Sequence, residues 1–243
     1  MFNIIWAIAK NTFLEGVRDR VFFVLILFFI VMLAVSIFLG SISVHQDSKI
    51  IADFGIAAAE LFSLAITVFV GASLLSKEIE KRTIIVLLSK PITSTQFIAG
   101  KFIGLAAMML VILLVMLVIY ILMSLLYHFW SPTIFLIFFL IYLQMLIVIG
   151  ITLLFSSFTS PMLVVMLTII TYMIGHLVAD LHEFAQIISY VLPNLDMLNL
   201  KNTIFYNNLP VTPAYLLYSI FYTVVYTGII LGVTILNFKK REF

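Results

Sequence analysis

The sequence predicts an all-α integral membrane protein with six transmembrane helices. Hydrophobic residues make up 64% of its 243 residues and charged residues only 10%, and the mean hydropathy is +1.27. A globular core of this length could not hide so much apolar surface, so lipid must be the solvent. Two further observations agree with this class, because the apolar residues fall into six long runs and the basic residues gather in alternate loops.

Each apolar run is near or above the roughly 20 residues that a helix needs to cross a bilayer. The first run is too long for the core of a cleaved signal peptide, and no soluble region follows it. We therefore expect a single transmembrane domain over residues 1–243. The predicted spans cover residues 21–42, 54–75, 102–127, 133–158, 162–179 and 213–237.

The N-terminal residues 2–18 predict an amphipathic helix that lies in the membrane interface, with Trp6 near the lipid headgroups. Charged residues at its end favour a break before the first span. A simple extension of that span is the alternative. The apolar stripe consists of Phe2, Ile5, Trp6, Ala9, Phe13 and Val17.

Lysine and arginine lie almost entirely on one side of the predicted membrane. If the N-terminus is inside, eleven of the 13 basic residues fall in inner segments, and only Lys49 and Lys201 fall outside. This positive-inside bias predicts that both termini and segment 76–101 are cytoplasmic.

Segment 76–101 is the only long charged stretch between two runs of bilayer length. It reads Glu78-Ile79-Glu80-Lys81-Arg82-Thr83, then Leu87-Leu88-Ser89-Lys90-Pro91, and ends at Gly100-Lys101. In order and spacing it resembles the loop after the second span in membrane subunits of type-2 (ABC-2) exporters. Two positions depart from that pattern: Arg82 replaces a glycine, and no arginine follows Pro91.

The resemblance implies that residues 77–100 form a cytoplasmic coupling helix that fits a cleft on a separate ABC ATPase subunit. A solvated loop without a partner is the alternative, but the apolar residues 84–88 beside the charges need a cover. The residues expected at the contact are Glu78, Glu80, Arg82, Thr83, Leu87 and Pro91.

ATP and Mg²⁺ are expected on the partner ATPase subunit. Gly100-Lys101 is followed by Phe102 and lacks the upstream glycine of a phosphate-binding loop. We therefore expect that the chain is not itself an enzyme and binds no cofactor, and we expect no nucleic-acid partner. The resemblance further implies a dimer, with a second copy or a related permease, in a bacterial cytoplasmic (inner) membrane.

Within the second span, Glu60 is an ionisable residue roughly 10 Å from the outer end at 1.5 Å per residue. Such a group should face protein or water rather than lipid. Ser63, Thr67 and Gly71 share its helix face, and His176 is a possible partner at similar depth. Two interpretations stay open: a stripe that lines a substrate path between two copies, with Glu60, Ser63, Thr67 and His176, or a helix-packing seam.

Two other chemistries have weaker support. His176, Asp180, His182 and Glu183 have helical spacing for a metal site, but such residues more often mark where a helix leaves lipid. Gly71-Ala72-Ser73 matches the pattern of intramembrane serine proteases. However, the topology places Ser73 and His176 at opposite ends of their spans, so no catalytic dyad is expected.

Residues 180–212 are polar enough to leave the membrane on the outer side. ABC-2 relatives carry short helices here, and Leu192-Pro193-Asn194 resembles the subgroup with nitrous-oxide reductase maturation and gliding-motility permeases. The segment is either an outer cap over the pathway or a passive interfacial loop.

The family resemblance implies an exporter that moves a substrate outward, with lipidic or amphipathic compounds as the expected class. A mechanotransmitter that acts on an outer-face protein without transport is the first alternative. A membrane anchor or assembly factor is the second.

Overall fold

A computed structural model describes residues 2–42, 47–80, 93–181, 192–199 and 212–240. All regular structure in these ranges is helical, which confirms the all-α prediction for the described part of the chain. The elements are α1 (Phe2–Arg18), α2 (Arg20–Ile42), α3 (Asp47–Glu80), α5 (Ser94–Leu126), α6 (Thr133–Ser156), α7 (Pro161–Leu181), the short 3₁₀ helix η1 (Asp196–Leu198) and α10 (Pro213–Lys240).

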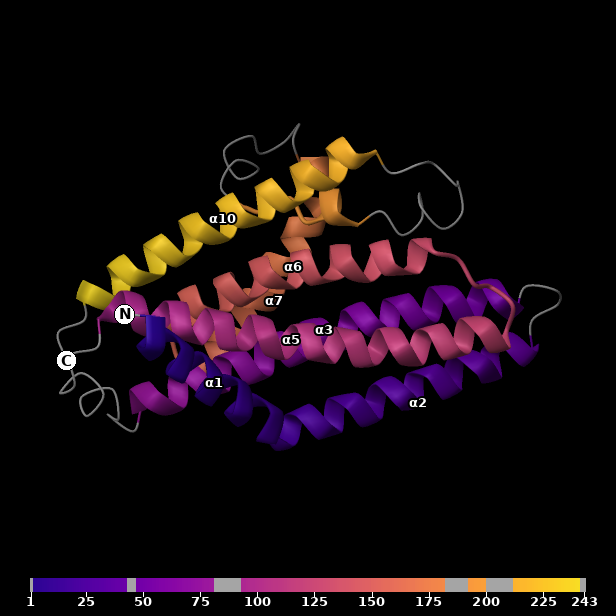
Figure 1. The fold of residues 1–243 in the computed structure, drawn as a ribbon, viewed down its shortest axis with the longest axis horizontal. Coiled ribbons are helices and arrows are strands. Elements are labelled where there is room, and N and C mark those ends of the chain that lie inside the picture. The colour runs from indigo at the N-terminus through magenta and orange to yellow at the C-terminus, as the bar shows by residue number, and fades with distance from the viewer. Residues whose placement is uncertain (1, 43–46, 81–92, 182–191, 200–211, 241–243) are drawn as a thin grey trace.

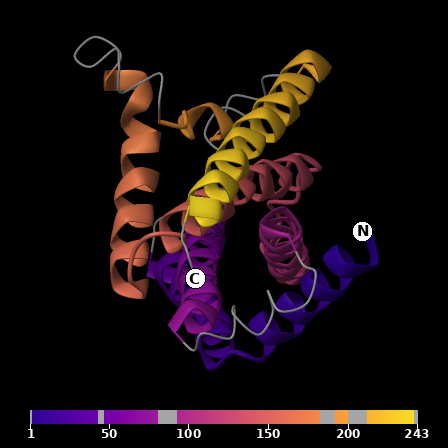
Figure 2. The same ribbon diagram turned by 90° about the vertical axis from the view of Figure 1, so that its left-hand side faces the viewer.

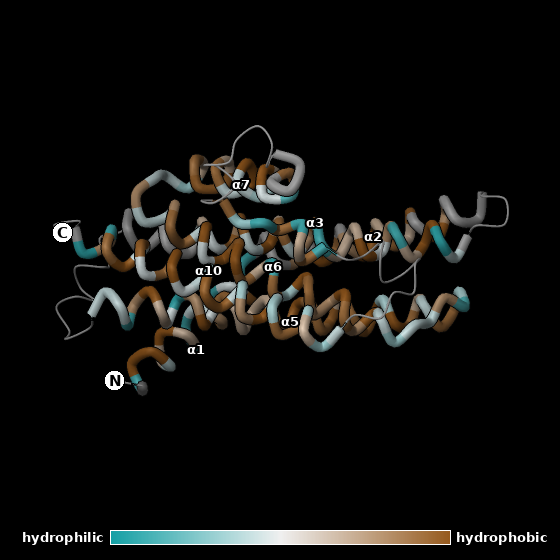
Figure 3. The backbone as a smooth tube through the Cα atoms, turned by 90° about the horizontal axis from the view of Figure 1, so that it is seen from above, coloured by the Kyte–Doolittle hydropathy of each residue, from teal (hydrophilic) through white to brown (hydrophobic). Residues whose placement is uncertain are grey.

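Four of the described helices are long and apolar enough to cross a bilayer. The apolar stretches are Ser48–Ser73, Ser94–Leu126, Thr133–Ser156 and Pro213–Lys239, and α7 contributes a shorter one, Pro161–Leu177. Hydrophobic residues run along the helices, and polar residues lie both at the ends of the bundle and near its middle (Figure 3). The chain is thus a multi-pass helical membrane protein, while the count of six spans stays a prediction.

The helices form an elongated bundle in which α6 is central (Figure 1). In its most apolar stretch 72% of the residues are buried, because α3, α5, α7 and α10 all pack against it. In the corresponding stretch of α10 only 28% are buried, so α10 is the most peripheral of the four. The start of α1, the ends of α3 and α10 and the start of α5 lie at one end of the bundle (Figure 1).

Two helices extend further than the hydropathy runs predict. Helix α3 continues through Glu80, five residues beyond the predicted end of the second span. Helix α5 begins at Ser94, where the Thr93 hydroxyl accepts from the Gln96 amide and the Gln96 side chain accepts from the Thr93 amide. This capping box satisfies backbone donors that a helix start otherwise leaves unpaired. Both helices therefore continue beyond the purely apolar stretches.

Helix α1 packs across the start of α5 through two glycines spaced four residues apart. A side chain on Gly100 would lie 2.7 Å from Ile8, and one on Gly104 would lie 2.6 Å from the Ala9 carbonyl oxygen. Glycines at this spacing allow helix backbones to approach closely. The face of α1 that packs on α5 thus includes Ile8, which lies off the predicted apolar stripe. Trp6, which belongs to that stripe, is exposed.

Candidate functional site

Four polar side chains from three helices meet in the interior of the bundle. Glu60 comes from α3, Gln144 from α6, and Tyr172 and His176 from α7. We call these four residues the polar cluster. Glu60 and Gln144 are 8% and 1% exposed, so protein encloses the cluster on most sides.

The Glu60 carboxylate oxygen Oε1 is the centre of the polar cluster. The Tyr172 hydroxyl donates to it over 2.8 Å, and the Gln144 amide donates to it over 3.2 Å. His176 Nε2 lies 3.8 Å from the same oxygen and 2.8 Å from Gln144 Nε2. Because donors converge on one carboxyl oxygen, the cluster links α7 to both α3 and α6.

Glu60 lies deeper than the sequence estimate of about seven residues from the outer end of the span. It stands midway along the 26-residue apolar stretch Ser48–Ser73, and Gln144 stands midway along α6. A carboxyl group at the middle of a bilayer is costly unless protein groups pair with it. The contacts to Tyr172 and Gln144 supply such pairing. The cluster can hold a proton or bind a donor-bearing group, depending on the protonation of Glu60 and His176.

Ser63 and Thr67 lie on the same face of α3 but contact the chain's own helices. The Ser63 hydroxyl approaches the Met116 sulfur over 3.9 Å, and the Thr67 hydroxyl approaches the sulfurs of Met109 and Met145 over 3.6 and 3.9 Å. These contacts describe a packing seam, the second of the two interpretations above. A pathway role for Ser63 and Thr67 stays a prediction.

Residues 192–199, which include η1, form a second feature, because this segment is inserted between α7 and α10 (Figure 2). The Leu195 amide donates to the Gly175 carbonyl of α7 over 2.9 Å, and the Asn194 amide donates to the Tyr222 hydroxyl of α10 over 2.8 Å. The Tyr215 hydroxyl donates to the Met197 carbonyl. These hydrogen bonds tie the segment to both α7 and α10.

Gly175 makes the docking of residues 192–199 possible. A side chain at this position would lie 2.9 Å from the Pro193 carbonyl oxygen and from the Leu195 side chain. Leu195 and Leu198 are buried. Residues 182–191, which precede this segment, lie outside the described residues.

Comparison with protein families identifies the chain. A family model described as "ABC-2 family transporter protein" matches residues 6–243. The chain belongs to the ABC-2 family. A search of curated proteins found no match.

Membership in the ABC-2 family makes this chain a membrane subunit of an ABC transporter, with an ABC ATPase subunit as its partner. Membrane subunits of this family are generally not enzymes themselves. The family resemblance seen in the sequence is confirmed at this level, and the finer assignments are taken up below as proposals.

The predicted ATPase contact lies largely beyond the described part of this ABC-2 protein. Arg82, Thr83, Leu87 and Pro91 are outside the described residues. Glu78 and Glu80 belong to the final turns of α3, at its C-terminal end. The predicted coupling helix over residues 77–100 therefore does not begin as a separate helix before Glu78, because α3 continues through Glu80.

The other two chemistries considered from the sequence gain no support in the described residues. Those residues hold no group of three potential metal ligands, and His182 and Glu183 lie outside them. Ser73 is thirteen residues from Glu60 along α3, about 20 Å at 1.5 Å per residue. Since His176 lies beside Glu60, it cannot activate Ser73.

Sequence reasoning missed Gln144, Tyr172 and Gly175. Gln144 is the only amide or charged residue in α6, which is a usable signal for a buried polar contact. Tyr172 stands four residues before His176, so both share one helix face. No pattern marks Gly175, because its role depends on a distant non-helical segment.

Proposed function

We propose that this chain is the transmembrane subunit of an ATP-driven exporter that moves a lipidic or amphipathic substrate outward. A separate ATPase subunit, which carries ATP and Mg²⁺, supplies the energy. The observation that carries the proposal is the ABC-2 family match, which covers residues 6–243 and therefore includes almost every described helix.

Six spans and cytoplasmic termini complete the proposed topology. Helices α2 and α7 have 23 and 21 residues, about 35 and 32 Å at 1.5 Å per residue, enough for a hydrocarbon core of about 30 Å. The distribution of basic residues favours a cytoplasmic N-terminus. The grouping of the start of α1, the ends of α3 and α10 and the start of α5 at one end of the bundle supports this (Figure 1).

Helix α3 connects the proposed ATPase contact to the polar cluster. The helix is continuous from Asp47 to Glu80, so Glu78 is about 27 Å from Glu60 at 1.5 Å per residue. A push on the end of α3 would therefore reach Glu60. Through Gln144 and Tyr172 it would then reach α6 and α7. We propose that α3 and α7 tilt together during transport.

The finer features of the assembly follow the resemblance. We propose a dimer of this chain, or a pair with a related permease, in a bacterial cytoplasmic membrane. Glu60, Ser63, Thr67 and His176 are proposed to lie along the route of the substrate. Leu192-Pro193-Asn194 supports the assignment of this chain to the subgroup with nitrous-oxide reductase maturation and gliding-motility permeases.

A second function, mechanotransmission to an outer-face protein, is favoured by one observation. Residues 192–199 are hydrogen-bonded to both α7 and α10, so a tilt of α7 would displace them. A partner bound to this segment would receive the movement without transport of a substrate.

Reconstitution with the partner ATPase separates these functions. Vesicles that contain the complex and a fluorescent phospholipid would be supplied with ATP, while ATP hydrolysis and outward lipid movement are measured together. The exporter predicts ATP-dependent lipid movement. Hydrolysis without movement of this or other amphipathic probes would favour mechanotransmission.

The double variant Glu78→Ala, Glu80→Ala tests the coupling contact. We expect it to weaken ATPase binding and to lower coupled hydrolysis about tenfold, as the loss of 1.4 kcal/mol implies. Glu15→Ala is the control, since Glu15 is an acidic residue of α1 outside the proposed contact. Unchanged hydrolysis in the double variant would contradict coupling and favour a membrane anchor.

A further inference from the structure

A large apolar cavity lies between α7 and α10. Its volume is about 450 Å³. Helix α6 supplies its floor through Leu154 and Phe155, Thr171 of α7 and Ile230 of α10 form its sides, and Leu192 lies at its edge. Among the described residues, no side chain fills it.

The inserted segment explains why this space stays open. Hydrogen bonds from residues 194 and 195 reach α10 and α7 respectively, so the segment bridges the two helices and separates them. Figure 2 shows α7 and α10 diverging on either side of it. The helices therefore cannot close on each other without breaking these bonds.

The size and lining of the cavity define what can occupy it. Protein interiors are close-packed and hold few voids larger than a water molecule. Apolar cavities of about 150 Å³ stay free of water and bind apolar molecules. A space of about 450 Å³ lined mainly by aliphatic and aromatic side chains therefore calls for an apolar ligand.

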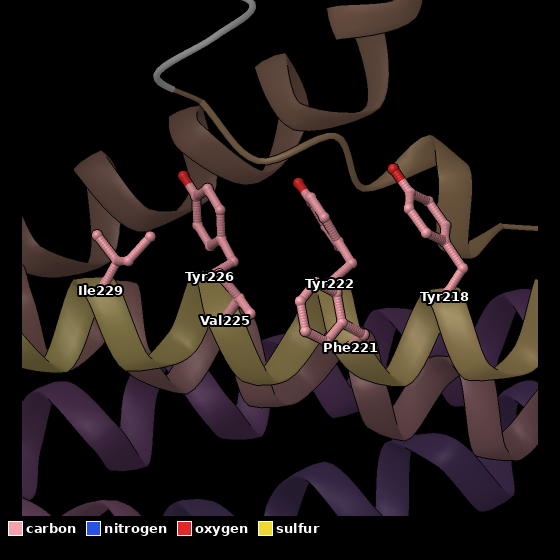
Figure 4. A pocket seen from close by; sticks show the side chains of 6 residues that line it. All are labelled: Tyr218, Phe221, Tyr222, Val225, Tyr226 and Ile229. Atoms are coloured by element: carbon pink, nitrogen blue, oxygen red, sulfur yellow. The ribbon is translucent and has the colours of Figure 1, made fainter.

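A shallow groove on α10 leads into the cavity. Tyr218, Tyr222 and Tyr226 form one side and project their hydroxyls in the same direction, with Phe221 and Val225 opposite them (Figure 4). The groove and the cavity share Tyr226 and Ile229, so they are continuous. From Tyr218 to Val233 the two extend about 22 Å along the helix at 1.5 Å per residue.

This groove is continuous with the lipid-facing surface of the protein. Helix α10 is a candidate span with few buried residues; Phe221 in the groove and Leu217 and Val224 beside it are exposed. The hydrocarbon of one leaflet is about 15 Å thick, half of the 30 Å core, which is within the length of the groove and cavity. Acyl chains of the bilayer thus have direct access.

We propose that the groove and the cavity bind one acyl chain of a bilayer phospholipid. The chain lies along the three tyrosine rings, and its end enters the space between α6, α7 and α10. Tyrosine suits the side of such a groove, because its ring is apolar while its hydroxyl can donate to an ester or phosphate oxygen. The inference does not depend on which substrate the transporter moves.

The test uses a phosphatidylethanolamine that carries a photoreactive diazirine in one acyl chain. The full-length protein in vesicles with this probe is extracted into detergent, irradiated and digested, and adducts are mapped by mass spectrometry. We expect adducts at Leu154, Phe155 and Ile230 that survive extraction. Adducts on exposed residues of α10 should be lost on extraction.

Two matched variants make the test specific. Ile229→Trp places a larger side chain where the groove meets the cavity, and Leu236→Trp changes a residue of α10 outside both. Ile229 and Leu236 are 62% and 60% exposed, so both variants should fold. We expect Ile229→Trp to lower cavity adducts about tenfold, the factor for 1.4 kcal/mol, and Leu236→Trp to leave them unchanged.

Three results would overturn the proposal. The first is adducts that are no more persistent in the cavity than on the exposed face. The second is the same adduct yield in Ile229→Trp as in the unaltered protein. The third is cross-linking of the cavity residues to a second copy or to residues 182–191 in place of lipid.

Discussion

The two sides of α7 are held by different kinds of contact. Toward α3 and α6, the polar cluster joins α7 to its neighbours through hydrogen bonds from Tyr172 and Gln144. Toward α10, residues 192–199 intervene and an apolar cavity of about 450 Å³ remains. In a bilayer apolar side chains gain little by leaving lipid for protein, so hydrogen bonds and close packing decide which helices stay together. We infer that α7 moves with α3 and α6 and changes its distance from α10.

The largest expected effect comes from truncating an isoleucine to alanine at two positions, one buried in α6 and one exposed on α10. Ile149→Ala removes a buried side chain from α6 and should lower the free energy of unfolding by about 3 kcal/mol. Ile229→Ala on α10 removes an exposed side chain beside an existing cavity and should cost less than about 0.5 kcal/mol. Unfolding of the purified protein in detergent measures both values. Equal losses of unfolding free energy would contradict the difference in packing between α6 and the cavity side of α10.

A second prediction concerns the polar cluster. Gln144→Leu keeps the volume but removes the amide that contacts Glu60, Tyr172 and His176. We expect a loss of about 1–3 kcal/mol in unfolding free energy, because the Glu60 carboxyl loses a donor. Met145→Leu, the adjacent buried residue, is the control and should cost less than about 1.5 kcal/mol. If the two variants were equally stable, the hydrogen bonds of the cluster would not hold α3, α6 and α7 together.

A third prediction concerns the contact that separates α7 from α10. Tyr222→Phe removes the hydroxyl that accepts from the Asn194 amide, at a cost of about 1 kcal/mol. Hydrogen exchange at Asn194 should therefore become about fivefold faster, the factor that corresponds to 1 kcal/mol. Tyr218→Phe is the control on the same face of α10. Exchange that stays at the original rate in Tyr222→Phe would show that this bond does not anchor the segment.

The smallest expected effect separates packing from transport in α3. Ser63→Ala removes a hydroxyl that makes a weak contact with the Met116 sulfur, so unfolding free energy should change by no more than about 0.5 kcal/mol. If Ser63 lines the route of the substrate, lipid movement in vesicles should still fall while stability stays constant. Unchanged transport would assign Ser63 to the packing seam alone.

Hydropathy predicted most of the described helices, while the orientation predicted from charge stays a prediction. Long apolar runs identified the helices, and the depth of Glu60 and His176 suggested their pairing, which the structure shows at 3.8 Å. The end of α3 and the start of α5 were misplaced because hydropathy marks only the apolar part of a helix, and a helix can continue beyond that part. The docking of Leu195 on Gly175 could not be predicted, since it joins a non-helical segment to a helix without any sequence periodicity.

Distance measurements test the central inference directly. The chain has no cysteine, so pairs of spin labels can be introduced at chosen positions without other changes. One pair, Leu61→Cys with Met173→Cys, reports the distance between α3 and α7, and another, Met173→Cys with Val225→Cys, reports α7 to α10; all three side chains are exposed. In the complex with its ATPase, addition of ATP should change the α7–α10 distance and leave the α3–α7 distance constant. A change between α3 and α7 with a constant α7–α10 distance would contradict the account.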